Sequence, residues 1–368
     1  MKICFLINVS SIHAERWLSY FTQMGHDVHA VSFESPTLRI ERVHYHIVPA
    51  NKKLLWFTFI FKLVKIRRII GEIKPDIIDA HYVVKYGAVA ALSNSHPLVV
   101  TAMGSDILIL SRENAIWRLV AKYVLGKTDL IVCRSPVVQK QILKLGMPVN
   151  KVRIIIPGVD TGRFLPLPKD VRLLQKLEIR PSDPVVISTR SLSPVYDVEA
   201  LVRAVPLVLS EEPEVQFLII GHGVQGNHLR KIAQELGVMA SVRFVGWISH
   251  AEIPRYLSSS DIYVSTSLSD GTPNSLLEAM SCELAPVVTS IPANQRWIKD
   301  GKNGYLVPIK DPTTLGNRII SLIKNEKERK TFGIKNRKIV QEKAEQKAEM
   351  KKLGAVYLDL VAGRMKNE

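Results

Sequence analysis

Cysteine is scarce in this chain of 368 residues, which has only three of them. Cys4, Cys133 and Cys282 lie far apart and form neither a CxxC pair nor a cluster with histidines. Their spacing therefore indicates neither a disulfide framework nor a zinc site, and we predict that the protein holds no metal. Cys4 and Cys133 stand in apolar runs, which is typical of small core residues.

Long apolar runs are also missing. None reaches the roughly 18–20 residues that a membrane-spanning helix needs, and residues 1–9 have the pattern of a strand rather than of a secretory signal. We therefore expect a cytoplasmic protein. The motif GxGxxG does not follow this first strand, which excludes a dinucleotide-binding dehydrogenase of the Rossmann type.

Acidic residues are too few to balance the basic ones. The chain has 50 Lys and Arg against 34 Asp and Glu, which gives a formal net charge of +16. Residues 1–165 carry 22 of the basic residues and 11 of the acidic ones, so most of the excess lies there. A basic surface attracts nucleic acid, anionic lipid or an anionic substrate, and charge alone does not choose among them.

Short apolar runs alternate with helical patterns from one end of the chain to the other. This alternation predicts an α/β protein with parallel sheets wound by right-handed crossovers. A first set of strands is expected at residues 2–9, 28–33, 77–80, 98–102, 130–134 and 153–156. A second set is expected at residues 185–190, 215–221, 242–245, 262–265, 285–289 and 304–307.

A turn-rich stretch separates the two sets. Residues 157–160 and 164–169 are rich in proline and follow neither the helix nor the strand period. We therefore expect an N-terminal domain over residues 1–165 and a C-terminal domain over residues 166–345. Residues 346–368 are expected to form a C-terminal helix that can return to the first domain.

Candidates for a donor site follow the strands of the second set, because ligands of open α/β sheets bind beyond the carboxyl ends of the strands. Thr272 and Pro273 suit the cap and first turn of a helix, whose free N–H groups would hold a phosphate. Asp270 precedes this helix and is placed to hold a sugar hydroxyl, and Glu278 is placed to accept bonds from ribose. Alternatively, Asp270 makes a plain turn, and Ser275 and Glu278 form a capping box.

Arg190 ends a predicted strand of the same set. Its guanidinium can neutralise a diphosphate through forked hydrogen bonds, or it can form an ordinary surface ion pair. Gly221 and Gly223 follow the next strand, where glycine lets the backbone approach a ligand closely. Between them, His222 is either a ligand contact or an exposed loop residue.

Together these segments resemble the retaining glycosyltransferases of family four, which have the GT-B fold. The similarity extends over nearly the whole chain, and the order of the motifs is more specific than any one of them. The matching segments are 144–164, 185–190, 217–223 (FLIIGHG), 242–247 (VRFVGW), 261–280 and 300–308 (DGKNGYLVP). The resemblance implies two Rossmann-like domains that face an interdomain cleft, where the sugar nucleotide binds beside residues 244–248.

The same resemblance implies roles for residues of the second domain. Asp270 matches a position that contacts the transferred sugar and is normally Glu, and Glu278 matches the ribose-binding residue. Arg190 matches the diphosphate-binding arginine, while Tyr196 stands about where the family has a lysine. The family's glycine loop and the backbone that meets phosphate and sugar correspond to Gly221, Gly223, Gly271, Thr272, Pro273, Asn274 and Ser275.

The first domain resembles the family less closely. His13 and Arg16 follow the first strand in a pattern that a subset of the family shares, and they are candidates to contact the acceptor or the donor phosphate. Alternatively, His13 caps a helix and Arg16 pairs with Glu15 or Glu41. His81 lies in a segment that resembles the family's His-x-His-Tyr and would orient an acceptor hydroxyl; otherwise it is a partly buried histidine.

Residues 101–106 resemble the family's segment Thr-x-His-Gly-Ser-Asp. Met103 stands where many members have the histidine that contacts the sugar, so this contact is not expected here. Ser105 and Asp106 keep the family's residue types. We expect Asp106 to act in catalysis beside Asp270, and Ser105 to bind the acceptor.

Residues 51–70 form an apolar and aromatic segment with basic residues at its edges, at positions 52, 53, 62, 65, 67 and 68. Such a helix can lie on an anionic bilayer, which would place the enzyme at the inner face of the cell membrane beside a lipid-linked acceptor. The alternative is an amphipathic core helix with a solvated basic face.

The resemblance implies a retaining, metal-independent transferase that moves a hexosyl or N-acetylhexosaminyl group from a nucleotide sugar to a glycan or lipid-linked acceptor in polysaccharide biosynthesis. It implies no cofactor besides the donor substrate. A GT-B nucleotide-sugar epimerase and an inverting transferase are the alternatives within this fold. A nucleic-acid-binding protein is disfavoured, because no motif with stacked aromatic residues is present.

Overall fold

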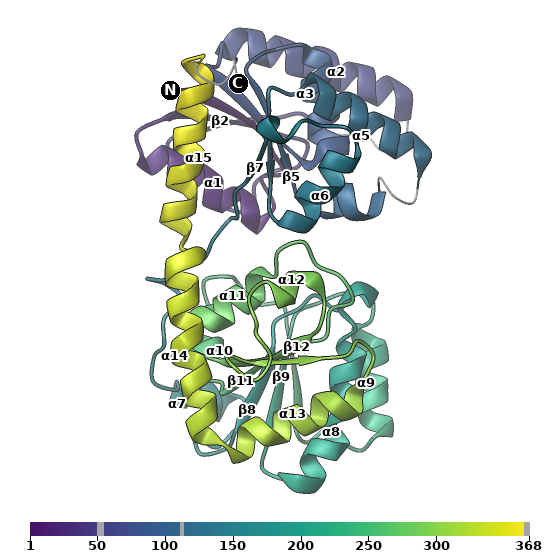
Figure 1. Ribbon diagram of the computed structural model, residues 1–368, viewed down its shortest axis with the longest axis vertical. Coiled ribbons are helices and arrows are strands. Elements are labelled where there is room, and N and C mark those ends of the chain that lie inside the picture. Colours follow the sequence, from purple (N-terminus) through teal and green to yellow (C-terminus); the bar gives the residue numbers. More distant parts are fainter. Residues whose placement is uncertain (50–54, 111–113, 364–368) are drawn as a thin grey trace. The chain divides into compact units, whose positions relative to one another are not determined.

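The computed structural model describes residues 1–49, 55–110 and 114–363, without the side chains of residues 12, 13, 55–59, 109 and 110. The chain divides into two compact units (Figure 1). The first contains Met1–Pro157 and Lys347–Glu368, and the second contains Gly158–Gln346. Both units follow the alternation of strand and helix that the sequence predicts.

The boundary between the units lies before Gly158, earlier than the boundary at residue 165 that we expected. Backbone hydrogen bonds explain the difference. Val159 N donates to Ala344 O at 2.8 Å, and Gln346 N donates to Val159 O at 3.0 Å. Phe164 is buried, and its carbonyl accepts from Ser281 Oγ at 2.5 Å. These bonds tie the proline-rich stretch to the second unit.

A seven-stranded parallel sheet forms the centre of the first unit, in the order β3-β2-β1-β4-β5-β6-β7. Its strands are β1 Lys2–Leu6, β2 Asp27–Ser32, β3 Val43–Ile47, β4 Ile77–His81, β5 Leu98–Ala102, β6 Leu130–Cys133 and β7 Val152–Ile154. The described helices are α1 Ile12–Gln23, α2 Leu55–Ile73, η1 Tyr82–Gly87, α3 Ala88–Ser93, η2 Asp106–Leu110, α5 Ala115–Lys127, α6 Pro136–Lys144, η3 Val149–Lys151 and α15 Gln346–Val361. Strand β3 was not predicted, because its two histidines interrupt the apolar pattern.

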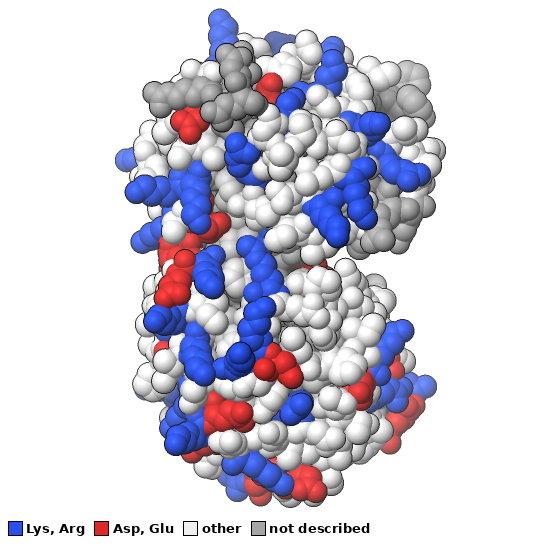
Figure 2. All heavy atoms as spheres, viewed as in Figure 1, with Lys and Arg blue, Asp and Glu red and all other residues white. Residues whose placement is uncertain are grey.

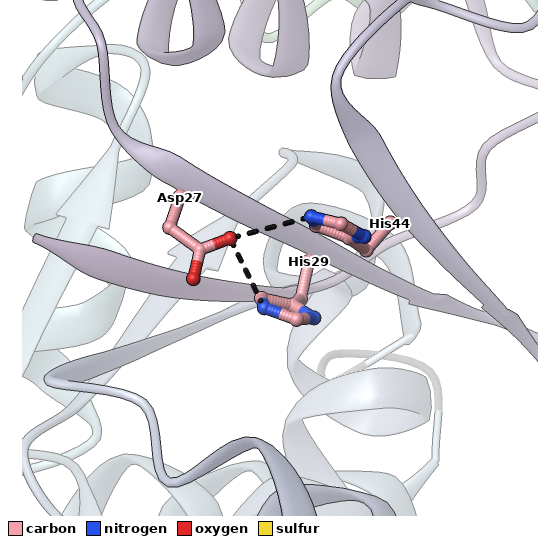
Figure 3. Close-up of side chains that lie close together, drawn as sticks. All are labelled: Asp27, His29 and His44. Carbon is pink, nitrogen blue, oxygen red and sulfur yellow. Dashed lines mark ion pairs between the residues drawn. The ribbon is translucent and has the colours of Figure 1, made fainter.

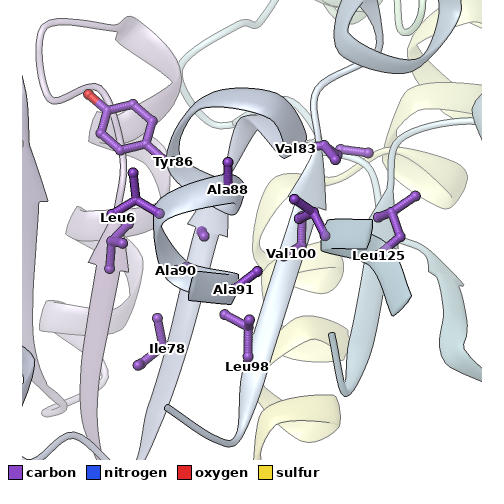
Figure 4. Close-up of a cluster of buried hydrophobic side chains, with 14 of the residues drawn as sticks. Leu6, Ile78, Val83, Tyr86, Ala88, Ala90, Ala91, Leu98, Val100 and Leu125 are labelled. Atoms are coloured by element: carbon purple, nitrogen blue, oxygen red, sulfur yellow. The ribbon is translucent and has the colours of Figure 1, made fainter. Parts of the chain in front are cut away.

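Each face of this sheet carries its own apolar core. On one face, Leu6, Ile78 and Val100 of the strands pack against the alanines of α3, whose small side chains let this helix approach the sheet closely (Figure 4). On the other face, α15 packs against α1, and the ring of Tyr357 stacks on that of Phe21 at 5.3 Å between centroids. The C-terminal helix is therefore part of the first unit.

The second unit is built on a six-stranded parallel sheet in the order β10-β9-β8-β11-β12-β13. Its strands are β8 Val185–Ser188, β9 Gln216–Ile220, β10 Val242–Gly246, β11 Ile262–Ser265, β12 Ala285–Thr289 and β13 Tyr305–Val307. Its helices are α7 Val171–Lys176, η4 Pro194–Tyr196, α8 Val198–Glu211, α9 Gly226–Glu235, α10 Ile253–Ser258, α11 Asn274–Ser281, α12 Pro292–Gln295, α13 Pro312–Lys324 and α14 Glu326–Lys343. All six strands of the predicted second set are confirmed. Across the described parts of both units, no helix combines the length and apolar character needed to cross a membrane.

Candidate active site

Arg190 is the centre of the candidate donor site in the second unit. It follows β8, and its side chain is 8% exposed. Its Nη1 donates to Ser275 Oγ at 2.7 Å, and its Nη2 donates to Asp270 Oδ2 at 2.6 Å. Tyr263 on β11 also donates to Ser275 Oγ, at 2.8 Å. The structure thus brings together three of the predicted donor-site residues beyond the carboxyl ends of neighbouring strands β8 and β11.

The guanidinium of Arg190 stays charged although it is buried. Burial opposes its charge, but the carboxylate of Asp270 outweighs this effect, together with Tyr263 and Tyr196, so that the pKa of Arg190 is raised. The guanidinium carbon lies 4.0 Å from the ring centroid of Tyr196, a distance at which a cation is attracted to an aromatic face. The site therefore holds a charged guanidinium that is paired with the carboxylate of Asp270.

Helix α11 begins at Asn274, and Pro273 is its N-cap rather than Thr272, which corrects the predicted capping. Pro273 provides no side-chain cap, and the amide of Asn274 donates to the carbonyl of Thr272 at 2.9 Å. Gly271 and Thr272 form a partly exposed bend before the helix. Ser275 and Glu278 do not form the alternative capping box, because both side chains are bonded elsewhere.

Two buried polar atoms of this site have no hydrogen-bond partner among the described residues: Arg190 Nε and Asn274 Oδ1. Buried polar atoms are nearly always satisfied in folded proteins. An unused donor and an unused acceptor, beside the start of α11, therefore indicate a place for a polar ligand.

Glu278 lies one turn into α11 and is 6% exposed. Its Oε1 is 2.9 Å from His250 Nε2, and the ring of His250 packs against Phe164 at 5.2 Å between centroids. Sequence reasoning missed His250, although it follows the stretch 244–248 that resembles the base-binding region. The contact with His250 thus helps to fix the orientation of this carboxylate.

Gly221 and Gly223 bring the loop after β9 against the backbone that follows β8. A Cβ at Gly221 would lie 2.3 Å from the carbonyl oxygen of Arg190, and one at Gly223 would lie 2.3 Å from that of Leu192. Leu192 N also donates to His222 O at 3.0 Å. These glycines therefore let the loop after β9 lie close to the segment that carries Arg190.

The candidate acceptor residues belong to the first unit. His81 ends β4 and is 2% exposed. Neither of its ring nitrogens has a hydrogen-bond partner among the described residues, although Nε2 lies 3.4 Å from Asp79 Oδ2. The ring meets Trp17 edge-on at 5.1 Å between centroids. The imidazole is therefore positioned by packing, and its nitrogens are not used by the described part of the fold.

Asp106 and Ser105 follow β5. Asp106 is fully buried, and its carboxylate accepts backbone N–H bonds from Val83 at 2.8 Å, Gly104 at 2.9 Å and Met103 at 3.3 Å. Burial raises the pKa of Asp106 against the opposite effect of these donors. Its contacts are those of a residue that supports the loop, and its catalytic role stays a prediction.

Ser105 is exposed at this edge of the sheet, and its hydroxyl lies 3.5 Å from that of Tyr82. Tyr82 follows His81 with a φ of +74°, a conformation that is unusual for a bulky residue. Such strain is often found at functional sites. Tyr82 is therefore a further candidate for the acceptor site. In the sequence, only its position next to His81 could have indicated this.

Two arginines of the first unit, Arg16 and Arg134, are buried. Arg16 is 8% exposed, and Arg134, directly after β6, is 4% exposed with its guanidinium carbon 5.4 Å from the Trp17 ring centroid. Sequence reasoning missed Arg134, which stood in the predicted strand 130–134. The side chain of His13 lies outside those that the structure describes.

The chain matches two family models. Residues 172–339 match the model described as glycosyl transferases group 1, and residues 2–135 match the one described as glycosyl transferase 4-like. The first match contains Arg190, Asp270 and Glu278. The second contains His81 and Asp106. Both sets of candidate residues thus lie in regions that the family models describe.

The chain is also similar in sequence and structure to named proteins. The N-acetyl-alpha-D-glucosaminyl L-malate synthase of Bacillus anthracis is 21% identical over 352 residues, which cover 92% of this chain and 91% of that protein. A GDP-mannose-dependent alpha-(1-6)-phosphatidylinositol monomannoside mannosyltransferase of Mycolicibacterium smegmatis is 25% identical over 288 residues, 74% of each. The crystal structure of Anabaena HepE in complex with UDP and glucose has a TM-score of 0.86 at 19% identity, covering 98% of this chain and 100% of that one.

Proposed function

Because the chain belongs to the glycosyltransferases of the GT-B fold, we propose that it transfers a hexosyl or N-acetylhexosaminyl group from a nucleotide sugar to a glycan or lipid-linked acceptor, with retention at the anomeric carbon. The observation that carries this proposal is the buried guanidinium of Arg190, held by Asp270 and Ser275 beside the start of α11. The second unit holds the donor, and the first holds the acceptor.

The donor's diphosphate accepts hydrogen bonds from Arg190 and from N–H groups at the start of α11. Forked guanidinium bonds and a helix N-terminus both favour an anion of this kind. Asp270, already fixed on the guanidinium, holds a hydroxyl of the sugar, and the carboxylate of Glu278 accepts from the ribose. In this arrangement protein groups neutralise the diphosphate, so no metal ion or other cofactor takes part.

In the proposed reaction, the bond between the anomeric carbon and the phosphate oxygen breaks while the acceptor hydroxyl attacks from the same face. The leaving phosphate oxygen takes the proton of that hydroxyl, so that no separate base is needed. Arg190 stabilises the charge that grows on the phosphate. Stabilisation of this type is worth about 3–4 kcal/mol per donor.

The acceptor carries a negative charge near the reacting hydroxyl. Arg16 and Arg134 support this part of the proposal, because buried guanidinium groups favour phosphate or carboxylate partners. The names of two relatives are consistent with it: N-acetyl-alpha-D-glucosaminyl L-malate synthase, and GDP-mannose-dependent alpha-(1-6)-phosphatidylinositol monomannoside mannosyltransferase. His81 and Ser105 then orient the hydroxyl.

A lipid-linked acceptor also fits an exposed surface of the first unit. On α2, Ile60, Phe61 and Val64 are each more than half exposed, and on α5 so are Ile116 and Leu119. Both helices cover the same face of the sheet. Figure 2 shows Lys and Arg side chains spread over the first unit with few acidic ones between them. An apolar, basic surface of this type binds anionic bilayers. Residues 51–54 of the predicted helix lie outside the described residues.

Calorimetric titration with UDP and with GDP, in the presence of EDTA, tests the donor site. We expect one of the two to bind with 1:1 stoichiometry, and Arg190→Ala to weaken binding by about tenfold or more, since hydrogen bonds to charged groups contribute about 1.5–3 kcal/mol. Arg203→Ala, which changes an exposed arginine on α8, is the matched control. Failure of both nucleotides to bind would refute the proposal.

The nucleotide that binds then identifies the sugar nucleotides to be screened. NMR of the product distinguishes the alternatives: an α-linked product from an α-linked donor supports retention, a β-linked product indicates inversion, and an epimerised donor without transfer indicates an epimerase.

Flotation with liposomes tests the membrane surface. We expect the wild type to bind vesicles that contain anionic lipid, and the double variant Phe61→Ser, Leu119→Ser to lose this binding. Equal binding of the variant and the wild type would contradict the proposal that this surface binds membranes.

A further inference from the structure

A cluster of one carboxylate and two imidazoles lies at the edge of the first unit's sheet (Figure 3). Asp27 and His29 stand on β2 with one residue between them, so both side chains point to the same face. His44 is the register partner of His29 on the neighbouring strand β3. One ligand atom from each of the three residues lies within 4.8 Å of the other two.

Two of the three distances in the cluster, those from the carboxylate to each imidazole, match the spacing of ligand atoms around a bound cation. Asp27 Oδ1 lies 3.2 Å from His29 Nε2 and 3.5 Å from His44 Nε2. With zinc bonds of about 2.0–2.2 Å, ligand atoms on a tetrahedral ion lie about 3.3 Å apart. Both imidazoles thus turn the same kind of nitrogen toward the same carboxylate oxygen, as ligands of one ion do.

The hydrogen bonding of His29 gives a second reason. Its Nδ1 lies 3.1 Å from His46 Nε2, so these two nitrogens share one proton. Its Nε2 is buried and makes no well-aligned hydrogen bond with the described residues, although Asp27 Oδ1 lies 3.2 Å away. When Nδ1 donates to His46, the lone pair on Nε2 faces the carboxylate oxygen, and a cation between them makes this contact favourable.

Charged groups of neighbouring elements also lie around the cluster. Lys2 Nζ lies 4.0 Å from the second oxygen of Asp27 and donates to the carbonyl of Ile73. Glu72 of α2 acts electrostatically on His46.

The cluster lies away from the candidate acceptor residues. Asp27 begins β2 and His44 lies near the start of β3, so the cluster stands at the amino ends of the strands. His81 and Ser105 stand at or beyond the carboxyl ends, where ligands of such sheets bind. Strand β3 is the edge strand of the sheet, so an ion in the cluster would fasten it to β2.

We propose that Asp27, His29 and His44 bind one divalent ion of the zinc class, which joins the edge strand β3 to β2. Two imidazoles and one carboxylate suit zinc and its neighbours, whereas magnesium and calcium prefer sites made of oxygen alone. Three protein ligands leave one tetrahedral position open, and the exposure of Asp27 and His44 admits a water molecule there. His46 orients His29 from behind.

Calorimetric titration of the full chain with ZnCl₂ tests the site. The protein is first dialysed against EDTA, and the EDTA is then removed. We expect one ion per chain, no binding of Mg²⁺, and a thermal unfolding midpoint that rises with the concentration of Zn²⁺. His44→Ala, which changes an exposed side chain, and Asp27→Asn, which preserves its shape, should each weaken Zn²⁺ binding by about tenfold or more.

His228→Ala is the matched control. His228 is an exposed imidazole 2.9 Å from the carboxylate of Glu199 in the second unit. Its replacement by alanine should leave Zn²⁺ binding unchanged. The proposal is overturned if the wild type shows no saturable binding, or if His44→Ala and Asp27→Asn bind Zn²⁺ as the wild type does. Nucleotide binding to the second unit is measured separately, so either result leaves the transferase proposal to its own test.

Discussion

The ring of Tyr196 faces the guanidinium of Arg190, with 4.0 Å between the ring centroid and the guanidinium carbon. The loop that carries Tyr196 is fixed to the segment before Asp270, since Thr266 Oγ1 donates to the carbonyl of Tyr196 at 3.0 Å and Leu268 N donates to that of Val195 at 2.8 Å. Where the family resemblance leads one to expect a lysine, this chain therefore has an aromatic surface that holds the arginine in place.

Replacement of Tyr196 by alanine should weaken donor binding. A cation–π contact is worth about 0.5–2 kcal/mol, so we expect the dissociation constant for the preferred nucleotide to rise by about 2–30-fold in calorimetry. Tyr196→Phe keeps the ring and serves as the control. If Tyr196→Ala binds the nucleotide as tightly as Tyr196→Phe, the ring does not position Arg190.

Asp270→Asn and Glu278→Gln should affect different kinetic constants. Asp270 is proposed to hold the transferred sugar, so its loss should lower kcat by about 100-fold or more. Glu278 is proposed to bind the ribose, so its loss should mainly raise KM for the donor, by about tenfold. Both are measured with the donor found by screening. Glu235→Gln, an exposed change on α9, should alter neither constant, and a wild-type kcat in Asp270→Asn would remove Asp270 from the site.

Much of the fold follows from the sequence, because buried strands of parallel sheets are short and continuously apolar. This is why all six strands of the second unit could be predicted, and why β3, with His44 and His46, could not. The donor residues could be located for a related reason: they follow strand ends, as Arg190 does. Contacts between segments far apart, such as His250 with Glu278, depend on how helices and loops pack, and no spacing in the sequence encodes them.

The proposed metal-binding cluster shows the same limit more sharply. The three scattered cysteines led us to predict no metal site. Asp27 and His29 are separated from His44 by the loop between two strands, and only the register of β2 and β3 brings them together. The alternation of His44 and His46 was a usable signal, because two histidines spaced by one residue share a face of a strand.

Gly221→Ala should destabilise the second unit and displace Arg190. The new Cβ would lie 2.3 Å from the carbonyl oxygen of Arg190, and the φ of Gly221 is +142°, which other residues rarely adopt. We expect a loss of about 2–4 kcal/mol in unfolding free energy, together with weaker nucleotide binding. Gly226→Ala, whose Cβ would lie 3.6 Å from Leu192 Cδ1, is the control and should retain stability. Equal denaturation midpoints in urea for the two variants would contradict this account.

Tyr357 should make the stability of the first unit sensitive to alkaline pH. Its hydroxyl donates to the buried carboxylate of Asp79. Burial raises the pKa of Tyr357 well above its usual value, and Asp79 raises it further. An unfolded tyrosine ionises near pH 10, so above this pH the folded chain binds more protons than the unfolded chain. The stability that Tyr357 contributes is therefore complete below about pH 10 and is lost as the pH rises from there toward the folded pKa.

Tyr357→Phe separates this effect from general alkaline unfolding. At pH 8 the variant should be less stable by about 1.5–3 kcal/mol, because a hydrogen bond to a charged group is lost. Between pH 9.5 and 11 its thermal midpoint should fall less steeply than that of the wild type, since the buried hydroxyl no longer has to ionise. Tyr123→Phe, at a side chain that is 48% exposed, should follow the wild type at every pH. Parallel curves for Tyr357→Phe and the wild type would show that the proton on Tyr357 does not control alkaline stability, and that the contact with Asp79 acts only through packing.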